Sequence, residues 1–512
     1  MTGKVYLLGA GPGDPGLITQ KAISCIQSCD VIIYDYLASP ALLSIAAPQA
    51  EQIYVGKKGG DHTMKQDQIN QLIVDKAREG HIVSRLKGGD PYIFGRGGEE
   101  AEFLKDHDIP FEVVPGITAG IAAPAYAGIP LTHRKMTSTL AFVTGHEDPT
   151  KSESSIHWPS LAKGIGTLVF YMGVKQLPGI VTQLLKHGKP ENTPVALVRW
   201  GTTSSQQTIT GQLHNIVDNV QAKNFRAPAI IVIGEVVNLR DQLNWFEQKP
   251  LFGKTIVVTR ARQQASDLLR KLNALGAECI ECPTIEIVPP NDIQPMESSI
   301  ANVEIYDWLV FTSVNGVRFF FKTLFSMGKD VRILGHLRLC TIGPVTAEEL
   351  MNYGLKTDIL PDTYQAESVV EAFEKESMTG KKVLIPRAKQ ARSVLPESLS
   401  DMGAVVDEVT AYQTIAGSGH DRGVVDRVQS ADIDMVTFTS SSTVTNFCDM
   451  FPGIAENASF KQKVAIASIG PITSETAQKK GLDVAVEAEV FTIPGLIGAI
   501  LGYWNKNQQY QS

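Results

Sequence analysis

A glycine-rich loop at residues 85–100 constrains the fold of this chain more than any other feature. The loop follows the apolar run 81–84, which is typical of a strand. Glycine has no Cβ, so backbone N–H and C=O groups in such a loop can approach a ligand closely. The carboxyl end of a strand in an α/β sheet is the usual place for a small-molecule site. A plain surface turn would not need the charged side chains that crowd the loop, which are Arg85, Lys87, Asp90 and Arg96.

Composition excludes several classes of protein. A chain of 512 residues is too long for one core, so we expect about two to four domains. The net charge of −7 offers no general basic face for nucleic acid. No apolar run approaches the roughly 20 residues of a membrane helix, and a strand pattern begins within the first residues, where a signal peptide would lie. We expect a cytoplasmic protein that contacts neither nucleic acid nor membrane.

The cysteines give no sign of a metal site. Only Cys279 and Cys282 have a CxxC spacing, and they lie in a strand-like run where residues three apart point to opposite faces. No second pair completes a tetrahedral zinc site. We therefore expect no bound metal, and we interpret all six cysteines as thiols.

The chain begins with an α/β pattern that permits more than one function. An apolar run, a glycine-rich loop at 9–16, a helix-like stretch and the strand 31–34 lead to Asp35. This order is typical of dinucleotide binding, with the acid on the ribose. Pro12 and Pro15 stiffen a turn that the dinucleotide fingerprint leaves to glycine. A nucleotide-dependent oxidoreductase therefore remains the alternative for this half.

Alternating strand and helix patterns continue up to about residue 240. Thr118 and Ala119 lie where a strand gives way to a helix, so their backbone groups can face a ligand. A polar gap at 147–157 precedes a second α/β set. Its expected strands are 168–171, 195–198 and 229–233.

Four motifs together carry a resemblance to a known family. They are residues 9–14, 85–100, 115–118 and 130–134, in the family's order and spacing. With them, residues 3–240 resemble the uroporphyrinogen-III C-methyltransferases of the tetrapyrrole methylase family. The resemblance implies two α/β subdomains with S-adenosylmethionine (SAM) between them, a tetrapyrrole substrate, and a homodimer formed through this half. The implied cofactor-binding residues are Pro12, Gly88, Gly89, Asp90, Ile93, Thr118, Ala119, Met172, Gly201 and Ala229.

The same resemblance assigns catalytic and substrate-binding residues. The pair that handles protons falls on Asp35 and Lys57. One position departs from the pattern, because Tyr36 stands where the family commonly has arginine, and tyrosine cannot form a guanidinium fork with a carboxylate. The substrate carries eight carboxylates, and arginine is the better bidentate partner for them. The candidate partners are Arg85, Lys87, Arg96 and Arg134.

The second half contains an internal repeat. A polar, proline-containing stretch at 245–253 is typical of a linker. Beyond it, the pair of segments 310–313 and 342–346 recurs as 437–440 and 469–473, with equal separation in both copies. Each copy predicts a strand, a Ser/Thr-rich loop, a helix, a strand, a Gly-Pro turn and a helix. Two such lobes would place similar loops around one cleft.

The repeat supplies hydroxyl side chains, and it shows no group of ionisable side chains that would act together as catalytic acid and base. Loops rich in Ser, Thr and helix-starting N–H groups suit carboxylates, although plain helix capping explains any one of these residues equally well. The sequence shows no Ser/His/Asp set, metal cluster or P-loop, which indicates a binder or an enzyme whose substrate supplies most of the reactivity. The candidate substrate-binding residues are Thr312, Ser313, Thr439 and Ser440.

Residues 253–500 resemble uroporphyrinogen-III synthase, through the two repeat copies and the segment 409–414. The resemblance implies two α/β lobes, 253–284 with 417–512 and 288–407, joined by a two-stranded connection. Its reaction converts hydroxymethylbilane, through an azafulvenium cation, to a ring with the last pyrrole inverted. Such a cation needs a dry cavity more than a strong acid or base. The implied catalytic residues are Thr346, Tyr412 and Thr473.

The two resemblances predict an α/β protein of two parts. Residues 1–247 would be a SAM-dependent uroporphyrinogen-III C-methyltransferase and residues 250–512 a uroporphyrinogen-III synthase. The chain would then make uroporphyrinogen III and methylate it twice to precorrin-2, a precursor of sirohaem and cobalamin, with the later pathway left open. The alternatives are an oxidoreductase with a binding domain, and a methyltransferase joined to a non-catalytic two-lobed binder.

Overall fold

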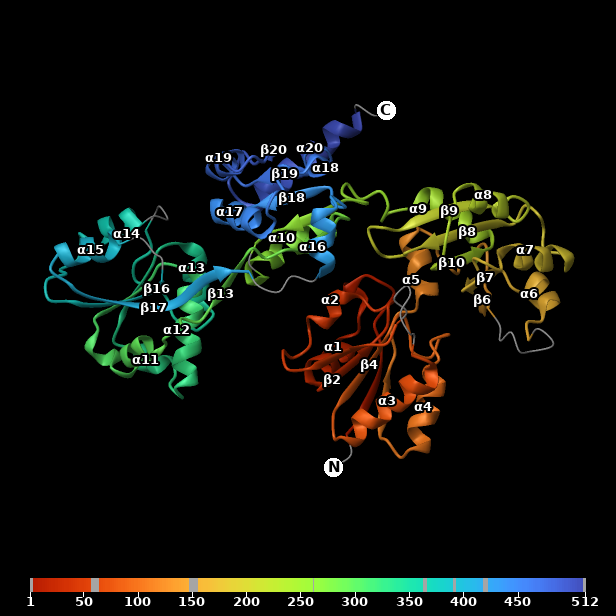
Figure 1. Cartoon of the computed structure of the whole chain (residues 1–512), viewed down its shortest axis with the longest axis horizontal. Coiled ribbons are helices and arrows are strands. Elements are labelled where there is room, and N and C mark those ends of the chain that lie inside the picture. Colours follow the sequence, from red (N-terminus) through yellow and green to blue (C-terminus); the bar gives the residue numbers. More distant parts are fainter. Residues whose placement is uncertain are drawn as a thin grey trace. The chain divides into compact units, whose positions relative to one another are not determined.

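The computed structural model describes residues 3–56, 64–146, 155–260, 262–361, 366–389, 393–417 and 422–509. Its strands form four five-stranded sheets connected by helices (Figure 1), which confirms the predicted α/β class. The chain divides into two compact units. One unit is Met1–Ile256 with Arg270–Cys279 and Leu501–Ser512, and the other is Val257–Leu269 with Ile280–Ile500.

The first sheet is parallel, with strand order β3-β2-β4-β1-β5. Apolar side chains pack on both of its faces, as expected for a parallel sheet covered by helices. Its strands are β1 (Val5–Gly9), β2 (Val31–Tyr34), β3 (Glu51–Tyr54), β4 (Val83–Lys87) and β5 (Phe111–Val114). The helices are η1 (Pro15–Leu17), α1 (Gln20–Ser28), α2 (Pro40–Leu43), α3 (Gln66–Arg78), α4 (Gly97–Asp106) and α5 (Ala119–Tyr126).

The second sheet is mixed, with strand order β6-β7-β10-β8-β9, and β10 runs antiparallel to both of its neighbours. The strands predicted for this region are confirmed. They correspond to β7 (Thr167–Tyr171), β8 (Pro194–Arg199) and β10 (Ala229–Ile233). The sheet also contains β6 (Leu140–Thr144) and β9 (Gln207–Gln212), which were not predicted. The helices are α6 (Trp158–Gly164), α7 (Leu177–Lys186), α8 (Ile216–Ala222), η2 (Glu235–Leu239) and α9 (Arg240–Leu243).

The third sheet has strand order β12-β11-β18-β19-β20 and joins a segment near residue 255 to segments beyond residue 434. Its strands come from the two ranges, 253–284 and 417–512, that the sequence analysis assigned to one lobe. Its strands are β11 (Thr255–Val258), β12 (Glu278–Glu281), β18 (Met435–Phe438), β19 (Ala465–Ser468) and β20 (Val484–Glu487). The helices are α10 (Arg262–Ala274), α16 (Arg422–Gln429), α17 (Ser441–Met450), α18 (Ala458–Lys463), α19 (Pro471–Lys479) and α20 (Ile493–Gln509).

The fourth sheet has strand order β13-β17-β16-β14-β15. The predicted two-stranded connection is confirmed, because β13 and β17 pair antiparallel from Ile285 opposite Ala416 to Val288 opposite Gln413. Its strands are β13 (Ile285–Val288), β14 (Trp308–Phe311), β15 (Arg338–Thr341), β16 (Lys382–Ala388) and β17 (Val405–Ala416). The helices are α11 (Gln294–Ala301), η3 (Val303–Ile305), α12 (Val314–Ser326), η4 (Val331–Leu334), α13 (Pro344–Met351), α14 (Ala366–Phe373) and α15 (Val394–Asp401).

The internal repeat is confirmed in three dimensions. The order β14-α12-β15-α13 matches β18-α17-β19-α19 apart from short intervening helices. Ser313 caps α12 by accepting the N–H of Gly316, and Ser440 caps α17 by accepting the N–H of Thr443. Both α13 and α19 begin with proline directly after an extended glycine. The Ser/Thr loops therefore begin the helices as their composition predicts.

Among the described helices, none combines the length and the apolar character that crossing a membrane requires.

Candidate active sites

Glycine backbones of three strand-end loops contact one another in the first unit. Gly89 and Gly11 exchange hydrogen bonds, at 2.7 Å from the Gly89 N–H and 3.2 Å from the Gly11 N–H. A Cβ on Gly116 would lie 2.2 Å from the Gly89 carbonyl oxygen, and Gly89 itself has φ +71°. Only glycine permits this approach and this backbone angle. The loops after β1, β4 and β5 therefore form one backbone-lined surface.

Asp90 holds this surface together. Its Oδ1 accepts the N–H groups of Tyr92 at 2.8 Å and Ile93 at 3.1 Å. Its Oδ2 accepts the N–H of Gly116 at 3.0 Å. Backbone donors thus use both carboxylate oxygens, so Asp90 fixes the shape of the loop that carries Gly88 and Gly89.

Three hydrogen bonds join segments that follow strands of the first sheet to the ends of strands in the second. The Tyr171 hydroxyl lies 2.8 Å from Thr118 Oγ1 and accepts the N–H of Gly120 at 2.9 Å. Burial raises the pKa of Tyr171, which keeps its hydroxyl protonated. The N–H of Asp14 donates to Thr202 Oγ1 at 2.9 Å. These contacts bring the loops of Thr118 and of Gly13–Asp14 to the loops that follow β7 and β8.

The remaining predicted cofactor residues lie around the same junction. A Cβ on Gly13, the neighbour of Pro12, would lie 3.3 Å from the Gly201 carbonyl oxygen. Ile93 is 37% exposed and Met172 is 52% exposed, although both side chains are apolar. Ala229 begins β10 and is half-buried. Exposed apolar side chains beside a backbone-lined surface fit a ligand with both apolar and polar parts.

Arg85 and Lys87 are placed differently from the surface loop that the sequence suggested. Both belong to β4, a central strand whose residues are all buried. Arg85 Nε lies 3.2 Å and Lys87 Nζ 2.8 Å from Glu100 Oε1. Burial lowers the pKa of Lys87. Both cations pair with Glu100 inside the fold, and Arg85 also lies near Asp35, so we no longer assign these two cations to substrate carboxylates.

Asp35 follows β2 at the carboxyl edge of the first sheet. Its Oδ1 accepts the N–H of Leu37 at 3.1 Å, and its Oδ2 lies 3.5 Å from Arg85 Nη2. The Asp35 side chain is 28% exposed, so it remains accessible to a ligand. Lys57, the other residue of the predicted pair, lies outside the described residues.

Arg96 and Arg134 lie at the surface, unlike Arg85 and Lys87. Arg96 Nε donates to Glu99 Oε1 at 2.9 Å, and this pairing raises the pKa of Arg96 and lowers that of Glu99. Arg134 is exposed on the segment that follows α5. Both therefore remain candidates for binding substrate carboxylates.

Tyr412 and Ser313 are neighbours in the second half. Their hydroxyl oxygens lie 3.1 Å apart, and the Tyr412 ring stacks on Phe319 with ring centroids 5.9 Å apart. Ser313 Oγ also accepts the N–H of Gly316. With that lone pair occupied, Ser313 can donate its own hydrogen to Tyr412, which leaves the tyrosine hydrogen for another acceptor.

The other hydroxyl residues predicted in the second half lie at helix starts. Thr346 in α13 and Thr473 in α19 are buried. In the third sheet's lobe, Ser441 Oγ donates to the Ile472 carbonyl at 3.3 Å, which brings the Ser440 loop to the Thr473 loop. Thr312 and Thr439 are half-buried at the ends of β14 and β18.

Several residues that hold the first half together were not identified from the sequence. Glu100, Tyr171 and Thr202 have roles that depend on partners distant along the chain. Tyr171 could have been identified from its position, because it is the last residue of β7 and directly precedes the candidate cofactor residue Met172. Tyr126 is a further example, because its hydroxyl donates to Asp14 Oδ2 at 2.7 Å, and its pKa is raised mainly by burial.

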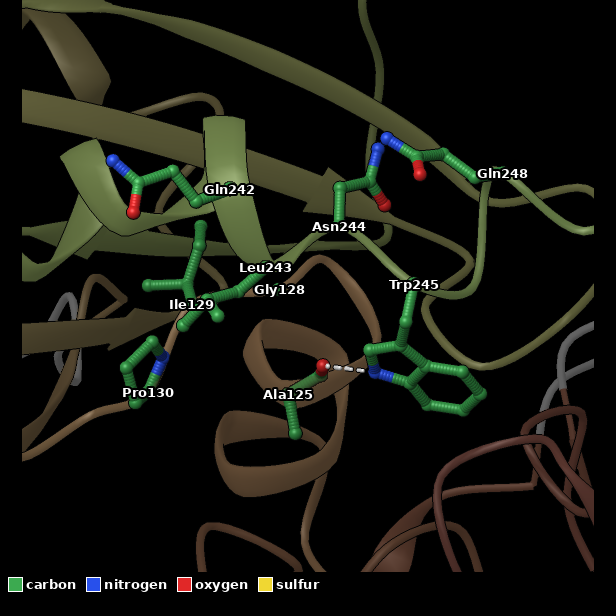
Figure 2. A pocket seen from close by; sticks show the side chains of 9 residues that line it. All are labelled: Ala125, Gly128, Ile129, Pro130, Gln242, Leu243, Asn244, Trp245 and Gln248. Carbon is green, nitrogen blue, oxygen red and sulfur yellow. Dashed lines mark hydrogen bonds between the residues drawn. The ribbon is translucent and has the colours of Figure 1, made fainter.

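A pocket of about 590 Å³ lies between the end of α5 and the segment 242–248 (Figure 2). The Trp245 indole N–H donates to the Ala125 carbonyl at 3.1 Å and closes one side of it. None of the predicted site residues lines this pocket, so it has no part in the proposed chemistry. Its lining residues are Ala125, Gly128, Ile129, Pro130, Gln242, Leu243, Asn244, Trp245 and Gln248.

The six cysteines are thiols, as expected. Burial raises the pKa of Cys282 to about 12, so this thiol is a poor nucleophile. Within the described ranges, no cluster of His, Cys, Asp and Glu side chains has the arrangement of a metal site.

Comparison with known families agrees with the geometry of both halves. Residues 4–217 match the family of Tetrapyrrole (Corrin/Porphyrin) Methylases, and residues 266–498 match Uroporphyrinogen-III synthase HemD. Porphyrin biosynthesis protein HemD of Ruminiclostridium josui is 36% identical over 98% of this chain and 98% of its own length.

Two further relatives match the first half. The S-adenosyl-L-methionine-dependent uroporphyrinogen III methyltransferase of Methanosarcina barkeri is 56% identical over 47% of this chain and 94% of its own length. The uroporphyrin-III C-methyl transferase of Thermus thermophilus, solved with S-adenyl homocysteine, is 38% identical. It covers 46% of this chain and 100% of its own, with a TM-score of 0.40.

These matches define a tetrapyrrole methylase followed by a uroporphyrinogen-III synthase. The chain belongs to the family of the porphyrin biosynthesis protein HemD, which it matches through both halves.

Proposed function

We propose that this chain catalyses two consecutive steps of tetrapyrrole biosynthesis. Its second half converts hydroxymethylbilane to uroporphyrinogen III, and its first half transfers two methyl groups from SAM to that product, giving precorrin-2. The observation that carries the proposal is the match of one HemD-type relative to 98% of the chain, across both halves. Neither matched family corresponds to the oxidoreductase that the first glycine-rich loop also permitted.

The residues of the first site fit SAM. Gly116 packs directly on the backbone of Gly89 and Gly9, and Gly89 has φ +71°, so glycine at both positions sets the shape of these loops. Their backbone amides and carbonyls suit the polar groups of the cofactor. Ile93 and Met172 offer exposed apolar side chains for its adenosyl part. Ala119 begins α5, and its N–H at the helix start can face a polar group of the cofactor. When bound, SAM supplies an electrophilic methyl group.

The chain's own residues then position the macrocycle and move a proton. Arg96 and Arg134 bind substrate carboxylates at the surface, where arginine can pair with both carboxylate oxygens. Asp35 removes the proton that the methylated macrocycle must lose. The Leu37 N–H and Arg85 Nη2 contact the two oxygens of Asp35 and fix the orientation of the carboxylate. Lys57 remains the proposed partner of Asp35.

The second half assists the departure of a hydroxyl group. The C–O bond of the hydroxymethyl group breaks, and the oxygen leaves as water with a proton taken up from solvent. The azafulvenium cation then forms the ring-closing carbon–carbon bond with the last pyrrole inverted, and a proton is lost to solvent. Tyr412 donates a hydrogen bond to that oxygen, and Ser313 holds the tyrosine hydroxyl. Further hydroxyl groups and helix N-termini are available for substrate carboxylates. They are supplied by Thr346, Thr473 and the loops at Thr312, Thr439 and Ser440.

Removing the Tyr412 hydroxyl tests this half. We expect Tyr412→Phe to slow uroporphyrinogen-III formation about tenfold and to release more of the uncatalysed type I isomer, because one hydrogen bond to the leaving oxygen is lost. Tyr306→Phe is the matched control, since its hydroxyl bonds Asp407 at 2.7 Å in the same lobe. Chromatographic separation of the isomers gives the result. A normal rate and III-to-I ratio in Tyr412→Phe would leave Tyr412 with a structural role only.

The whole proposal is tested by supplying each half-reaction separately to the full chain. Hydroxymethylbilane without SAM should give uroporphyrinogen III, and uroporphyrinogen III with SAM should take up two methyl groups. If the first reaction fails while the second succeeds, the second half is a binding domain, which is the alternative that the sequence left open.

We also propose that the protein is cytoplasmic and that two copies pair through the first half. Apolar side chains exposed on that half, including Met136, Leu140 and Leu243, support the pairing. Analytical ultracentrifugation of the full chain distinguishes a dimer from a monomer.

A further inference from the structure

Two aromatic rings meet beside Asp35. Tyr36 follows β2 in the first sheet, and Trp200 follows β8 in the second. Their ring centroids lie 6.0 Å apart with an interplanar angle of 67°, an edge-to-face arrangement. Tyr36 is 61% exposed and Trp200 is half-buried, so the pair is not part of a core. The two rings therefore present an accessible aromatic surface beside the Asp35 carboxylate.

The turn that carries Tyr36 is tightly packed. A Cβ on Gly88 would lie 2.5 Å from Leu37 Cβ, and a Cβ on Gly56 would lie 2.7 Å from the Tyr36 nitrogen. The turn therefore contacts glycine backbone on two sides, and the Leu37 N–H is bonded to Asp35. The backbone of Tyr36 is held in place while its ring stays accessible.

Trp200 is held in a strained conformation. Its φ of +48° lies in the left-handed region, where a bulky side chain is an outlier. Its carbonyl accepts both the hydroxyl of Thr203 at 2.7 Å and the N–H of Thr203 at 3.3 Å, which fixes the turn. Glycine or asparagine would adopt this angle with less strain, and strained residues concentrate at functional sites. The chain therefore keeps a bulky indole here at a conformational cost.

We propose that Tyr36 and Trp200 bind a pyrrole ring of the tetrapyrrole substrate through its π face. This inference rests on the proposed methyltransferase function. Pyrrole rings are electron-rich and apolar, and aromatic side chains bind such rings by stacking and edge-to-face contact. The pair thereby orients the macrocycle over Asp35 and leaves its carboxylates to Arg96 and Arg134. Binding of the macrocycle at this point depends on the aromatic rings of Tyr36 and Trp200 and not on charged side chains.

The test is a calorimetric titration of the full chain with uroporphyrinogen III under anaerobic conditions, without SAM. Tyr36→Ala and Trp200→Gly should each raise the Kd about tenfold, because each removes one aromatic contact. Tyr36→Phe should stay within about twofold of the unaltered protein, since the ring is retained. Trp200→Gly also relieves the left-handed strain, so its melting temperature should not fall. In turnover assays, KM should rise more than kcat falls.

Trp245→Ala is the control, because Trp245 is a comparably exposed aromatic residue of the same unit, in the pocket of Figure 2. Unchanged uroporphyrinogen-III affinity in folded Tyr36→Ala overturns the inference and leaves the proposed function intact. An equal loss of affinity in Trp245→Ala also overturns it, since the effect would not be specific to the pair. If the unaltered chain binds no uroporphyrinogen III, the proposed function fails as well.

Discussion

Asp35→Asn should lower methylation turnover by roughly 10²–10⁴-fold, the usual contribution of a general base. The amide has nearly the shape of the carboxylate and can still accept the Leu37 N–H, but it cannot take a proton at neutral pH. SAM affinity should be nearly unchanged, because Asp35 lies on the turn after β2 and not on the loop of Gly89. Single-turnover methyl transfer to uroporphyrinogen III, measured beside SAM binding, separates the two effects.

The chain offers a matched control for this variant. Asp30 lies at the opposite end of β2, where its Oδ2 accepts the N–H of Ile82 at 2.8 Å. Asp30→Asn removes one carboxylate from the same strand and should leave methylation within about twofold. Synthase activity of Asp35→Asn is a second, internal control and should be normal. Loss of SAM affinity with normal turnover at saturation would instead show that Asp35 binds the cofactor.

Gly89→Val should abolish SAM binding. A Cβ at this position would lie 3.6 Å from the Ala119 nitrogen, an ordinary contact, so crowding inside the protein is not the main cause. The φ of +71° is the cause, because a β-branched residue cannot hold it without strain of about 1–3 kcal/mol. The loop should shift and take its backbone groups out of reach of the cofactor. A typical domain stability of about 5–15 kcal/mol leaves the fold intact.

Gly98→Val is the control that separates the effect of a changed loop conformation at Gly89 from the effect of introducing any valine. Gly98 lies in α4, and no atom lies within 4 Å of the position its Cβ would take. Calorimetry should show normal SAM affinity for this control and none for Gly89→Val, with similar circular dichroism for both. Normal affinity in a folded Gly89→Val variant would remove the loop from the cofactor site.

The sequence predicted the fold class, the repeat and the glycine loops because each has a local signature. Gly89, Gly116 and the Ser313 cap are recognised within a few neighbouring residues, since backbone angles and helix starts are locally determined. The two-stranded connection followed from the resemblance alone. The glycine loops and the helix cap could be predicted without knowing which distant residues contact each other.

The misplaced residues share one cause. Arg85 and Lys87 looked like loop cations because the strand was taken to end at Ser84, whereas β4 continues to Lys87. Their partner Glu100 lies in α4, and nothing local shows that a helix returns its carboxylate to that strand. Tyr171 and Trp200 were missed for the same reason, since their contacts cross between two sheets. Polar pairs of high sequence separation become visible only in the folded chain.

The central claim is that two adjacent steps are carried by one chain. The most direct test is to supply the full-length protein with hydroxymethylbilane and SAM, with no other enzyme, and to follow the products by mass spectrometry. We predict precorrin-2, the dimethylated derivative of the type III isomer, with uroporphyrinogen III as the intermediate. Accumulation of unmethylated type I isomer alone, from a protein that methylates added uroporphyrinogen III, would contradict the claim.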